Sequence, residues 1–492
     1  MSALRSQIAK GSFLMVLMRL LDRGIAFVST IILARLLTPD DFGIVAMAAS
    51  FIALIELISA FSFDVVLIQK QDAGREEFNT AWTFNILVGV AICLLAFLSA
   101  DFIARFYETP ELVFVVYVMG ISVLLDKSIN IGIVYFRKDL KFHMDFAFVM
   151  IRRVCGFLLT ITLAYYLRSY WAIVLGTLGA RTIAFFLSFL MHSYRPWFSL
   201  AKARELFGFS CWLMINNVLG FINMRAADFI IGKIIGARGL GFYTIAFEIS
   251  TLPSNALVAP INRAIFPGYA KVSGHLDSLA KAYLEVLSAI SIVAVPAGLG
   301  IAAVADPAVR LLLGEKWLDA IELIQLLALG GTMTVLTTNT GYVFLALGRP
   351  RLHTTMMAIL TAVYLPALFW GIMTFGLLGA AYSFIIKEAV FLLMNIGVIV
   401  VILQIGILQL IRSVYRPILS ALVMFTAIKL SQSYHPDLLA AMPLAAQLIA
   451  VIIGGGLVYL AGLMLLFVGA GMPDGLERMV LQKTGLIRRN QQ

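Results

Sequence analysis

Charged residues are scarce in this chain. Asp, Glu, Lys and Arg together make up 13% of its 492 residues, whereas a soluble domain averages about 25%. Hydrophobic residues make up 61%, and the mean hydropathy is +0.96. This composition excludes a soluble globular protein and indicates an integral membrane protein. The net charge of +10 has no soluble basic domain to carry it, so nucleic-acid binding is not expected.

Cysteine and histidine are also scarce, with three and five copies. Cys93, Cys155 and Cys211 lie within apolar segments, so neither a disulfide framework nor a thiolate metal site is supported. The histidines lack metal-ligand spacing, and the chain contains neither a Walker-type glycine loop nor a GxSxG element. The acidic pair Asp40-Asp41 is expected to cap a helix. We therefore predict a transporter and not an enzyme, with no metal and no cofactor beyond a coupling proton or sodium ion.

Long apolar runs recur along the whole chain. Each holds about 20 residues, enough to cross about 30 Å of hydrocarbon, and none shows the alternation of a barrel strand. The predicted fold is an all-α integral membrane protein of about 14 transmembrane helices. Short breaks at Arg168-Ser169 and Phe375-Gly376 divide runs that could otherwise be single helices. The predicted spans are residues 12–33, 42–63, 80–104, 111–135, 146–167, 170–191, 208–230, 239–262, 283–304, 320–346, 354–374, 378–402, 415–432 and 443–469.

Lysine and arginine are unevenly distributed between the two sets of loops. If the N-terminus is cytoplasmic, the cytoplasmic segments hold 21 of these residues and the opposite loops hold 8. Basic residues favour the cytoplasmic side of a membrane. The sequence therefore predicts a multi-pass protein with both termini in the cytoplasm.

Two segments of the chain resemble each other. Residues 30–48 read TIILARLLTPDDFGIVAMA, and residues 228–246 read DFIIGKIIGARGLGFYTIA. At an offset of 198 residues a basic residue, a turn and a glycine coincide, which favours duplication over chance similarity. The offset covers six spans, so the halves are expected to be parallel repeats with the substrate site at their interface.

The repeat predicts three parts of the chain. An N-lobe covers residues 1–198, a C-lobe covers residues 199–402, and residues 403–492 hold two additional spans and a basic cytoplasmic tail. Residues 199–206, between the lobes, are expected to form a short amphipathic helix.

Eight basic residues lie deep within the apolar segments. A cation near the middle of a bilayer costs roughly 2.5–3.5 kcal/mol on insertion scales, so these side chains are expected to face a wet cavity or a buried partner. A cavity lined with cations suits an anion, which makes the eight the predicted substrate-binding residues. Arg152 lies nearest the interface and could reach it instead. The eight are Arg19, Arg23, Lys127, Arg152, Arg153, Arg181, Arg225 and Lys387.

Acidic residues are fewer in these segments and indicate where an ion could be coupled to transport. A purely structural interpretation stays open, because Asp22 lies three residues after Arg19 and Asp228 three after Arg225, so each could be neutralised on its own helix. Lys387-Glu388 could likewise form a pair. The predicted ion-coupling candidates are Asp22, Glu56, Asp228 and Glu248.

Several segments resemble a known family. The opening RSQIAKGSFLMVLMRLLDRG, the turn LARLLTPDDFGIVAMA, the stretch APINRAIFPGYAKVSG and the motif LLLGEKW are similar to bacterial Wzx-type polysaccharide exporters. These belong to the multidrug/oligosaccharidyl-lipid/polysaccharide superfamily, and the branch that this chain resembles is that of the colanic acid exporter. The resemblance covers essentially the whole chain and implies fourteen helices in two bundles around a V-shaped central cavity.

The resemblance also implies a function. Such a protein is a flippase that moves undecaprenyl-pyrophosphate-linked oligosaccharide repeat units across the bacterial inner membrane by alternating access, for exopolysaccharide or lipopolysaccharide biosynthesis. The implied partners are this lipid-linked oligosaccharide, membrane lipids, a polysaccharide polymerase and a chain-length regulator. A pyrophosphate is an anion that Arg clusters hold well. Three alternatives stay open: a multidrug exporter of the same superfamily, a lipid II flippase, and a membrane-embedded polysaccharide polymerase.

Overall fold

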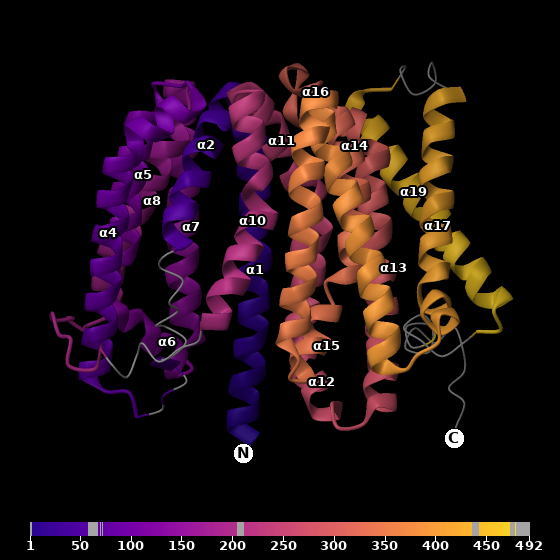
Figure 1. The fold of residues 1–492 in the computed structure, drawn as a ribbon, viewed down its shortest axis with the longest axis horizontal. Coiled ribbons are helices and arrows are strands. Elements are labelled where there is room, and N and C mark those ends of the chain that lie inside the picture. Colours follow the sequence, from indigo (N-terminus) through magenta and orange to yellow (C-terminus); the bar gives the residue numbers. More distant parts are fainter. Residues whose placement is uncertain are drawn as a thin grey trace. The chain divides into compact units, whose positions relative to one another are not determined.

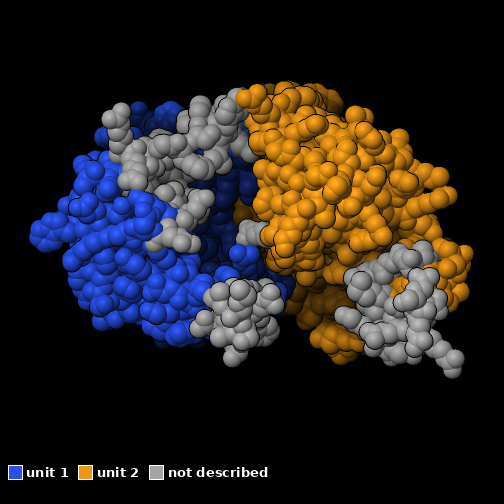
Figure 2. All heavy atoms as spheres, turned by 90° about the horizontal axis from the view of Figure 1, so that it is seen from below, with its two compact units in different colours: residues 1–241 blue, residues 242–492 orange. Residues whose placement is uncertain are grey.

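The protein is built from helices. The computed structural model describes residues 2–57, 67–68, 70, 72–203, 211–434, 442–472 and 478. These residues contain no strand, and the predicted all-α fold is confirmed. The chain divides into two compact units, residues 1–241 and 242–492 (Figure 2). The lobe boundaries expected after residues 198 and 402 stay predictions.

The helices follow one another along the chain as labelled in Figure 1. The first unit contains α1 (Ser2–Leu36), α2 (Pro39–Glu56), α4 (Arg75–Tyr107), α5 (Leu112–Lys127), η2 (Ile131–Ile133), α6 (Val134–Lys138), α7 (Phe142–Leu167), α8 (Trp171–Met191), α10 (Cys211–Ile234) and the start of α11 (Ala237–Ser250). The second unit contains the rest of α11, η3 (Pro253–Val258), α12 (Ala259–Val272), α13 (Leu276–Ala308), η4 (Val309–Leu313), η5 (Glu315–Trp317), α14 (Ala320–Thr337), α15 (Thr340–Ala346), α16 (Pro350–Leu403), α17 (Ile407–Tyr434) and α19 (Leu444–Gly469).

Many of these helices are long enough to cross a membrane. Within the described residues, eight are both long and apolar enough, and the pair formed by α5 and residues 131–138, bent by 55°, could make a ninth. Such helices satisfy their own backbone hydrogen bonds, as the hydrocarbon region requires. The chain is therefore a multi-pass membrane protein, while the total of fourteen spans stays a prediction.

Both of the short breaks predicted from the sequence are present. α7 ends at Leu167 because Arg168 adopts a left-handed backbone with φ of 46°. Inside α16, Gly376 has φ of 59° and ψ of −136°, a conformation that glycine adopts without steric cost. The Ser383 hydroxyl donates a hydrogen bond to the Ala367 carbonyl at 2.8 Å. α16 is therefore a hairpin of two helices that turns at Gly376.

The two segments of the sequence repeat meet at their glycines. A Cβ atom on Gly43 would collide with the carbonyl group of Ala237, and a Cβ atom on Gly241 would collide with that of Pro39. The contact is reciprocal, since Pro39 corresponds to Ala237 and Gly43 to Gly241 at the offset of 198 residues. Only glycine allows so close an approach of two backbones. This accounts for the glycine in each copy, although the duplication itself stays a prediction.

α2 begins at the acidic pair noted in the sequence. Asp41 Oδ2 accepts hydrogen bonds from the backbone N–H of Thr38 at 2.8 Å and from its hydroxyl at 2.7 Å. The Thr38 hydroxyl in turn accepts from Asp41 N at 3.4 Å, which completes a capping box. Asp41 Oδ1 accepts from the backbone N–H of Tyr170 at 2.7 Å, at the start of α8. The predicted helix cap is confirmed for Asp41, which completes the cap with Thr38 as the N-cap residue, and Asp41 also ties two helices together.

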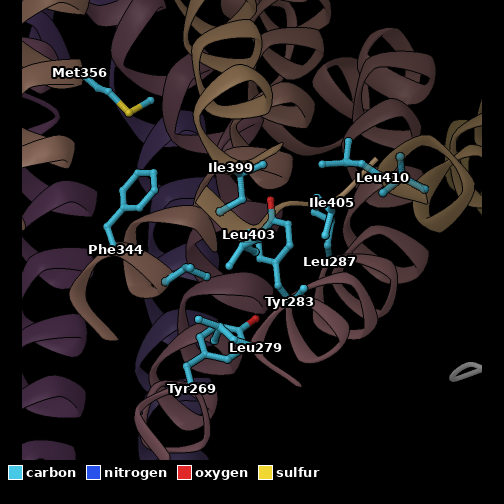
Figure 3. Close-up of a cluster of buried hydrophobic side chains, with 13 residues drawn as sticks. Tyr269, Leu279, Tyr283, Leu287, Phe344, Met356, Ile399, Leu403, Ile405 and Leu410 are labelled. Atoms are coloured by element: carbon cyan, nitrogen blue, oxygen red, sulfur yellow. The ribbon is translucent and has the colours of Figure 1, made fainter. Parts of the chain in front are cut away.

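The core of the second unit includes a cluster of buried apolar side chains, most of them from α12, α13, α15, α16 and α17 (Figure 3). Tyr283 of α13 lies among them, and its hydroxyl is 3.3 Å from the Thr340 hydroxyl. Tyr269 donates to Asn339 Oδ1 at 3.2 Å. The tyrosine rings thus contribute apolar area while their hydroxyl groups stay paired, as buried polar groups require.

The segment after α8 is held against α4 by polar side chains. Asn79 Oδ1 accepts hydrogen bonds from the Tyr194 hydroxyl at 2.7 Å and from Trp197 N at 3.0 Å. Thr83 Oγ1 accepts from Ser199 N at 3.0 Å. Residues 192–200 form no helix, and the described residues end at 203. The amphipathic helix predicted over residues 199–206 is thus wrong for residues 199–202, and residues 204–206 lie outside the described residues.

His192 accepts a backbone hydrogen bond at the start of this segment. The protonation state of its ring should therefore affect how well the segment is ordered. Its Nδ1 accepts a hydrogen bond from Tyr194 N at 3.0 Å. Burial, with help from Lys141, lowers the pKa of His192. A lowered pKa means that the neutral ring contributes stability above about pH 6.5, its unfolded value, and that this contribution is lost as the pH falls. Protonated Nδ1 is a donor and cannot accept from Tyr194.

We therefore expect residues 192–203 to exchange their amide hydrogens faster below about pH 6 than above about pH 7, after correction for intrinsic rates. The His192→Ala variant should show fast exchange at both pH values, because the acceptor for the Tyr194 N–H is missing at either pH. Equal protection of the native segment across this range would contradict the prediction.

Candidate functional site

Six of the eight predicted substrate-binding cations lie on four helices of the first unit. Helices α1 and α7 are joined by the ion pair between Asp22 and Arg153, whose Oδ1 and Nε atoms are 3.0 Å apart. The Arg153 guanidinium also donates to the Asp22 backbone carbonyl at 3.4 Å. This pair places the cations of α1, Arg19 and Arg23, at the same level as those of α7. Asp22 therefore pairs with an arginine of another helix. It does not pair with Arg19, which lies three residues before it on α1 and was the partner suggested by the sequence.

Helix α5 adds a second ion pair and another cation at this level. Arg152 Nη1 lies 4.0 Å from Asp126 Oδ1. Lys127 follows Asp126 directly, and its side chain lies against Gly89 of α4, where an added Cβ would approach its Cβ to 2.9 Å. Arg152 therefore reaches a carboxylate of α5.

Arg181 of α8 lies beside the same part of α7. A Cβ atom on Gly156 would approach the Cβ of Ala180 to 2.7 Å, so α7 and α8 touch one turn beyond Arg152 and Arg153. Small residues at such crossings let membrane helices approach closely. Arg181 follows Ala180 and is half-buried. We call the six side chains Arg19, Arg23, Lys127, Arg152, Arg153 and Arg181 the cationic band.

Charge in the cationic band is not balanced. Its ion pairs engage two carboxylates, those of Asp22 and Asp126, against six cations. Among the described residues, the other four cations form no ion pair or hydrogen bond; these are Arg19, Arg23, Lys127 and Arg181. Arg19 and Arg23 are exposed, and the other two are half-buried. The band can therefore bind an anion with side chains that give up no existing partner.

The other two predicted cations are paired with neighbouring acids. In α10, Arg225 Nη1 lies 2.9 Å from Asp228 Oδ2, and the Ser50 hydroxyl lies 3.1 Å from the same oxygen. In the second unit, Lys387 Nζ lies 3.0 Å from Glu388 Oε1, with both side chains at least nine-tenths buried. The structure does not bring Lys387 together with the cationic band within one unit.

The predicted ion-coupling residues occupy different environments. Asp22 lies in the cationic band, and Asp228 is buried at the contact of α10 with α2. Glu56 is half-buried near the end of α2, and Glu248 is exposed on α11; both take part in interactions with other groups. The described residues contain no cluster of three His, Cys, Asp or Glu side chains that could hold a metal ion.

Sequence reasoning missed two polar residues beside Asp228. Ser50 interacts with it, and the Tyr107 hydroxyl interacts with it electrostatically. Ser50 lies next to Phe51, whose ring is 5.6 Å from Tyr107 and 4.9 Å from Phe229. No local motif marks either residue, because both come from other helices. The only available signal was the small hydroxyl of Ser50 in an otherwise apolar run.

Comparison with known proteins places this chain among membrane transporters of polysaccharide biosynthesis. A family model described as polysaccharide biosynthesis protein matches residues 32–322. The lipopolysaccharide biosynthesis protein WzxC of Escherichia coli is 25% identical over 75% of this chain and 75% of its own length. The teichuronic acid biosynthesis protein TuaB of Bacillus subtilis is 26% identical over 74% of this chain and 76% of its own length.

Solved structures share the fold. The lipid II flippase MurJ, in an inward closed conformation, aligns with a TM-score of 0.71 and 13% identity over 94% of this chain and 99% of its own. An inward-facing multidrug resistance MATE family transporter of the MOP superfamily aligns with a TM-score of 0.54 and 16% identity over 84% of this chain and 99% of its own. The resemblance to Wzx-type exporters expected from the sequence is confirmed. The family model covers more than half of the sequence, and the chain belongs to the polysaccharide biosynthesis protein family.

Proposed function

We propose that this protein is a flippase that moves undecaprenyl-pyrophosphate-linked oligosaccharide repeat units across the bacterial inner membrane, with both termini in the cytoplasm. The observation that carries the proposal is the excess of cations in the cationic band. Four basic side chains without an acidic partner lie on α1, α5 and α8, which we expect to be membrane helices, where each would be costly unless it served a ligand or faced water. A pyrophosphate supplies the missing negative charge.

The types of side chain in the band suit this ligand. Five of the six cations are arginines, whose planar guanidinium groups bind phosphate oxygens with two parallel hydrogen bonds. Arg19 and Arg23 lie one turn apart on the same face of α1, so both can contact one headgroup. We assign the pyrophosphate to Arg19, Arg23, Lys127 and Arg181, with Arg153 and Arg225 as further ligands once their carboxylates are released.

Coupling to an ion gradient completes the proposal. The candidates stay Asp22, Glu56, Asp228 and Glu248. Asp22 forms an ion pair with Arg153, so a proton on Asp22 would release that arginine. The isoprenoid tail is expected to contribute less specificity than the charged headgroup, because apolar contacts discriminate weakly between similar groups.

Reconstitution tests the proposal. Purified protein in liposomes should move a fluorescent undecaprenyl-pyrophosphate oligosaccharide between leaflets, and inorganic pyrophosphate should compete. The same vesicles should leave cationic drugs untransported and should not lengthen the glycan, which separates a flippase from a multidrug exporter and a polymerase. Faster transport of lipid II than of the oligosaccharide carrier would assign the cargo to the alternative flippase. Transport of neither lipid would overturn the proposal.

A further inference from the structure

Helix α10 presents a buried carboxylate to two other helices of the first unit. Asp228 is 7% exposed, and Arg225 and Gly232 share its face of α10 because they lie three residues before it and four after it. Gly232 lies against the ring of Tyr107 from α4, since an added Cβ would come within 2.6 Å of that ring. Ser50 of α2 reaches the carboxylate itself. Three helices thus meet at Asp228.

The Ser50 hydroxyl has two acceptors and one hydrogen. Its oxygen lies 2.8 Å from the Ala46 carbonyl and 3.1 Å from Asp228 Oδ2, yet a hydroxyl donates only once. With an ionised Asp228, one of the two acceptors goes without that hydrogen. With a protonated Asp228, the new O–H donates to Ser50 Oγ while Ser50 donates to Ala46. Every member of the chain is then satisfied, which low-dielectric surroundings favour.

Tyr107 adds a second unsatisfied group. Its residue is 5% exposed, and within the described part of the chain its hydroxyl has no hydrogen-bond partner. A buried polar group left unpaired costs free energy. The ring of Tyr107 lies against Gly232, one helical turn after Asp228, and its hydroxyl interacts electrostatically with the carboxylate.

We propose that Asp228 is a proton-binding site, and that its protonation releases Arg225 to bind an anionic group of the substrate. The proton comes from water and forms a bond to Asp228 Oδ2, which changes a carboxylate into a neutral carboxylic acid. Arg225 keeps its charge throughout and loses only its partner. Its side chain is 41% exposed, so it can turn to a ligand. This inference rests on the proposed function for the identity of that ligand.

The surroundings determine that the exchangeable ion is a proton. Arg225 already occupies Asp228 Oδ2 at 2.9 Å, and a metal cation at the same oxygen would be repelled by the guanidinium. The other charged groups nearby neutralise each other, since Lys233 of α10 pairs with Glu108 at 2.8 Å. Tyr107 is the titratable group presented by α4, and α2 presents Ser50, which does not titrate.

The experiment measures binding of farnesyl pyrophosphate to the purified protein at about pH 5 and about pH 8. Proton and anion binding assist each other reciprocally, so native protein should bind the probe more tightly at low pH. Asp228→Asn mimics the protonated form and should bind at least about tenfold more tightly than native protein at about pH 8, with equal affinity at about pH 5. Glu108→Gln, a matched control, should keep the native pH dependence.

Two results distinguish this inference from the proposed function. If native protein binds the probe and Asp228→Asn shows the same pH dependence, the proton site is wrong and the flippase proposal stands. If native protein binds no probe at any pH, the flippase proposal fails. The proton site is then judged by infrared spectroscopy alone. A protonated-carboxyl band that appears at low pH and is missing in Asp228→Asn supports the proton site, and its absence overturns it.

Discussion

Replacing Arg23 or Arg181 by alanine should strongly reduce polysaccharide export, and replacing both should abolish it, while the protein stays folded in the membrane. Neither side chain has an acidic partner in the described structure, so its removal leaves no carboxylate unpaired. A hydrogen bond to a charged group contributes about 1.5–3 kcal/mol, which corresponds to about a tenfold to hundredfold loss of affinity for each arginine. Removing both should therefore eliminate binding at cellular concentrations. Export in cells that lack the native gene and binding of farnesyl pyrophosphate measure the two effects.

The paired arginine of the same band provides the contrast. Arg153→Ala leaves Asp22 without its partner at 3.0 Å, so it should lower the unfolding temperature as well as export. Adding Asp22→Asn to it should restore the unfolding temperature. As a matched control, Arg310→Ala in the second unit removes an arginine from an exposed i,i+4 pair with Asp306, and it should change neither export nor stability measurably. Full export by both Arg23→Ala and Arg181→Ala would contradict the assignment of the cationic band.

The positions of the helices followed from the sequence because membrane spans are long, apolar and locally determined. The break at Gly376 was predictable from a Phe-Gly pair between two runs, and the structure places a backbone there that favours glycine. The non-helical conformation of the segment after α8, residues 192–200, was not predictable. Its sequence resembles a short amphipathic helix, but Asn79 and Thr83 of α4 accept hydrogen bonds from its backbone, which is not helical over residues 192–200. Hydrogen bonds to distant side chains outweighed the local preference.

In the candidate site too, contacts within one helix were predictable from the sequence, and contacts between helices were not. Arg225–Asp228 was a predictable pair, because residues three apart share one face of a helix. Lys387 and Glu388 were a candidate pair only as neighbours in the chain, and the structure pairs them at 3.0 Å. The pair of Asp22 with Arg153 depends on the packing of α1 against α7, which spacing does not reveal. The sequence could count more cations than acids in the N-terminal half. It could not say which of them have partners, and that distinction decides which arginines are worth replacing.

Lys387→Met should destabilise the protein by about 3–5 kcal/mol, because it leaves a buried carboxylate without a counter-charge. Glu388 is 5% exposed, and Lys387 is 8% exposed. The ammonium group also lies over the rings of Tyr364 and Phe384, at 5.1 and 4.7 Å from their centroids, so its surroundings are closed on several sides. Thermal unfolding of the purified protein in detergent measures the loss, and little folded protein is expected at the growth temperature.

Replacing both members of this pair separates structure from substrate binding. Lys387→Met combined with Glu388→Leu removes both charges and keeps similar volumes, an exchange that is often neutral or stabilising for a buried ion pair. The double variant should therefore recover the native unfolding temperature. It should also export polysaccharide at the native rate, because the pair is neutral by itself and an anion gains nothing from it. Recovered stability with lost export would instead show that Lys387 contacts the substrate, as the sequence predicted. The pair would then have to open during transport, and the free energy that holds Lys387 to Glu388 would oppose each binding event.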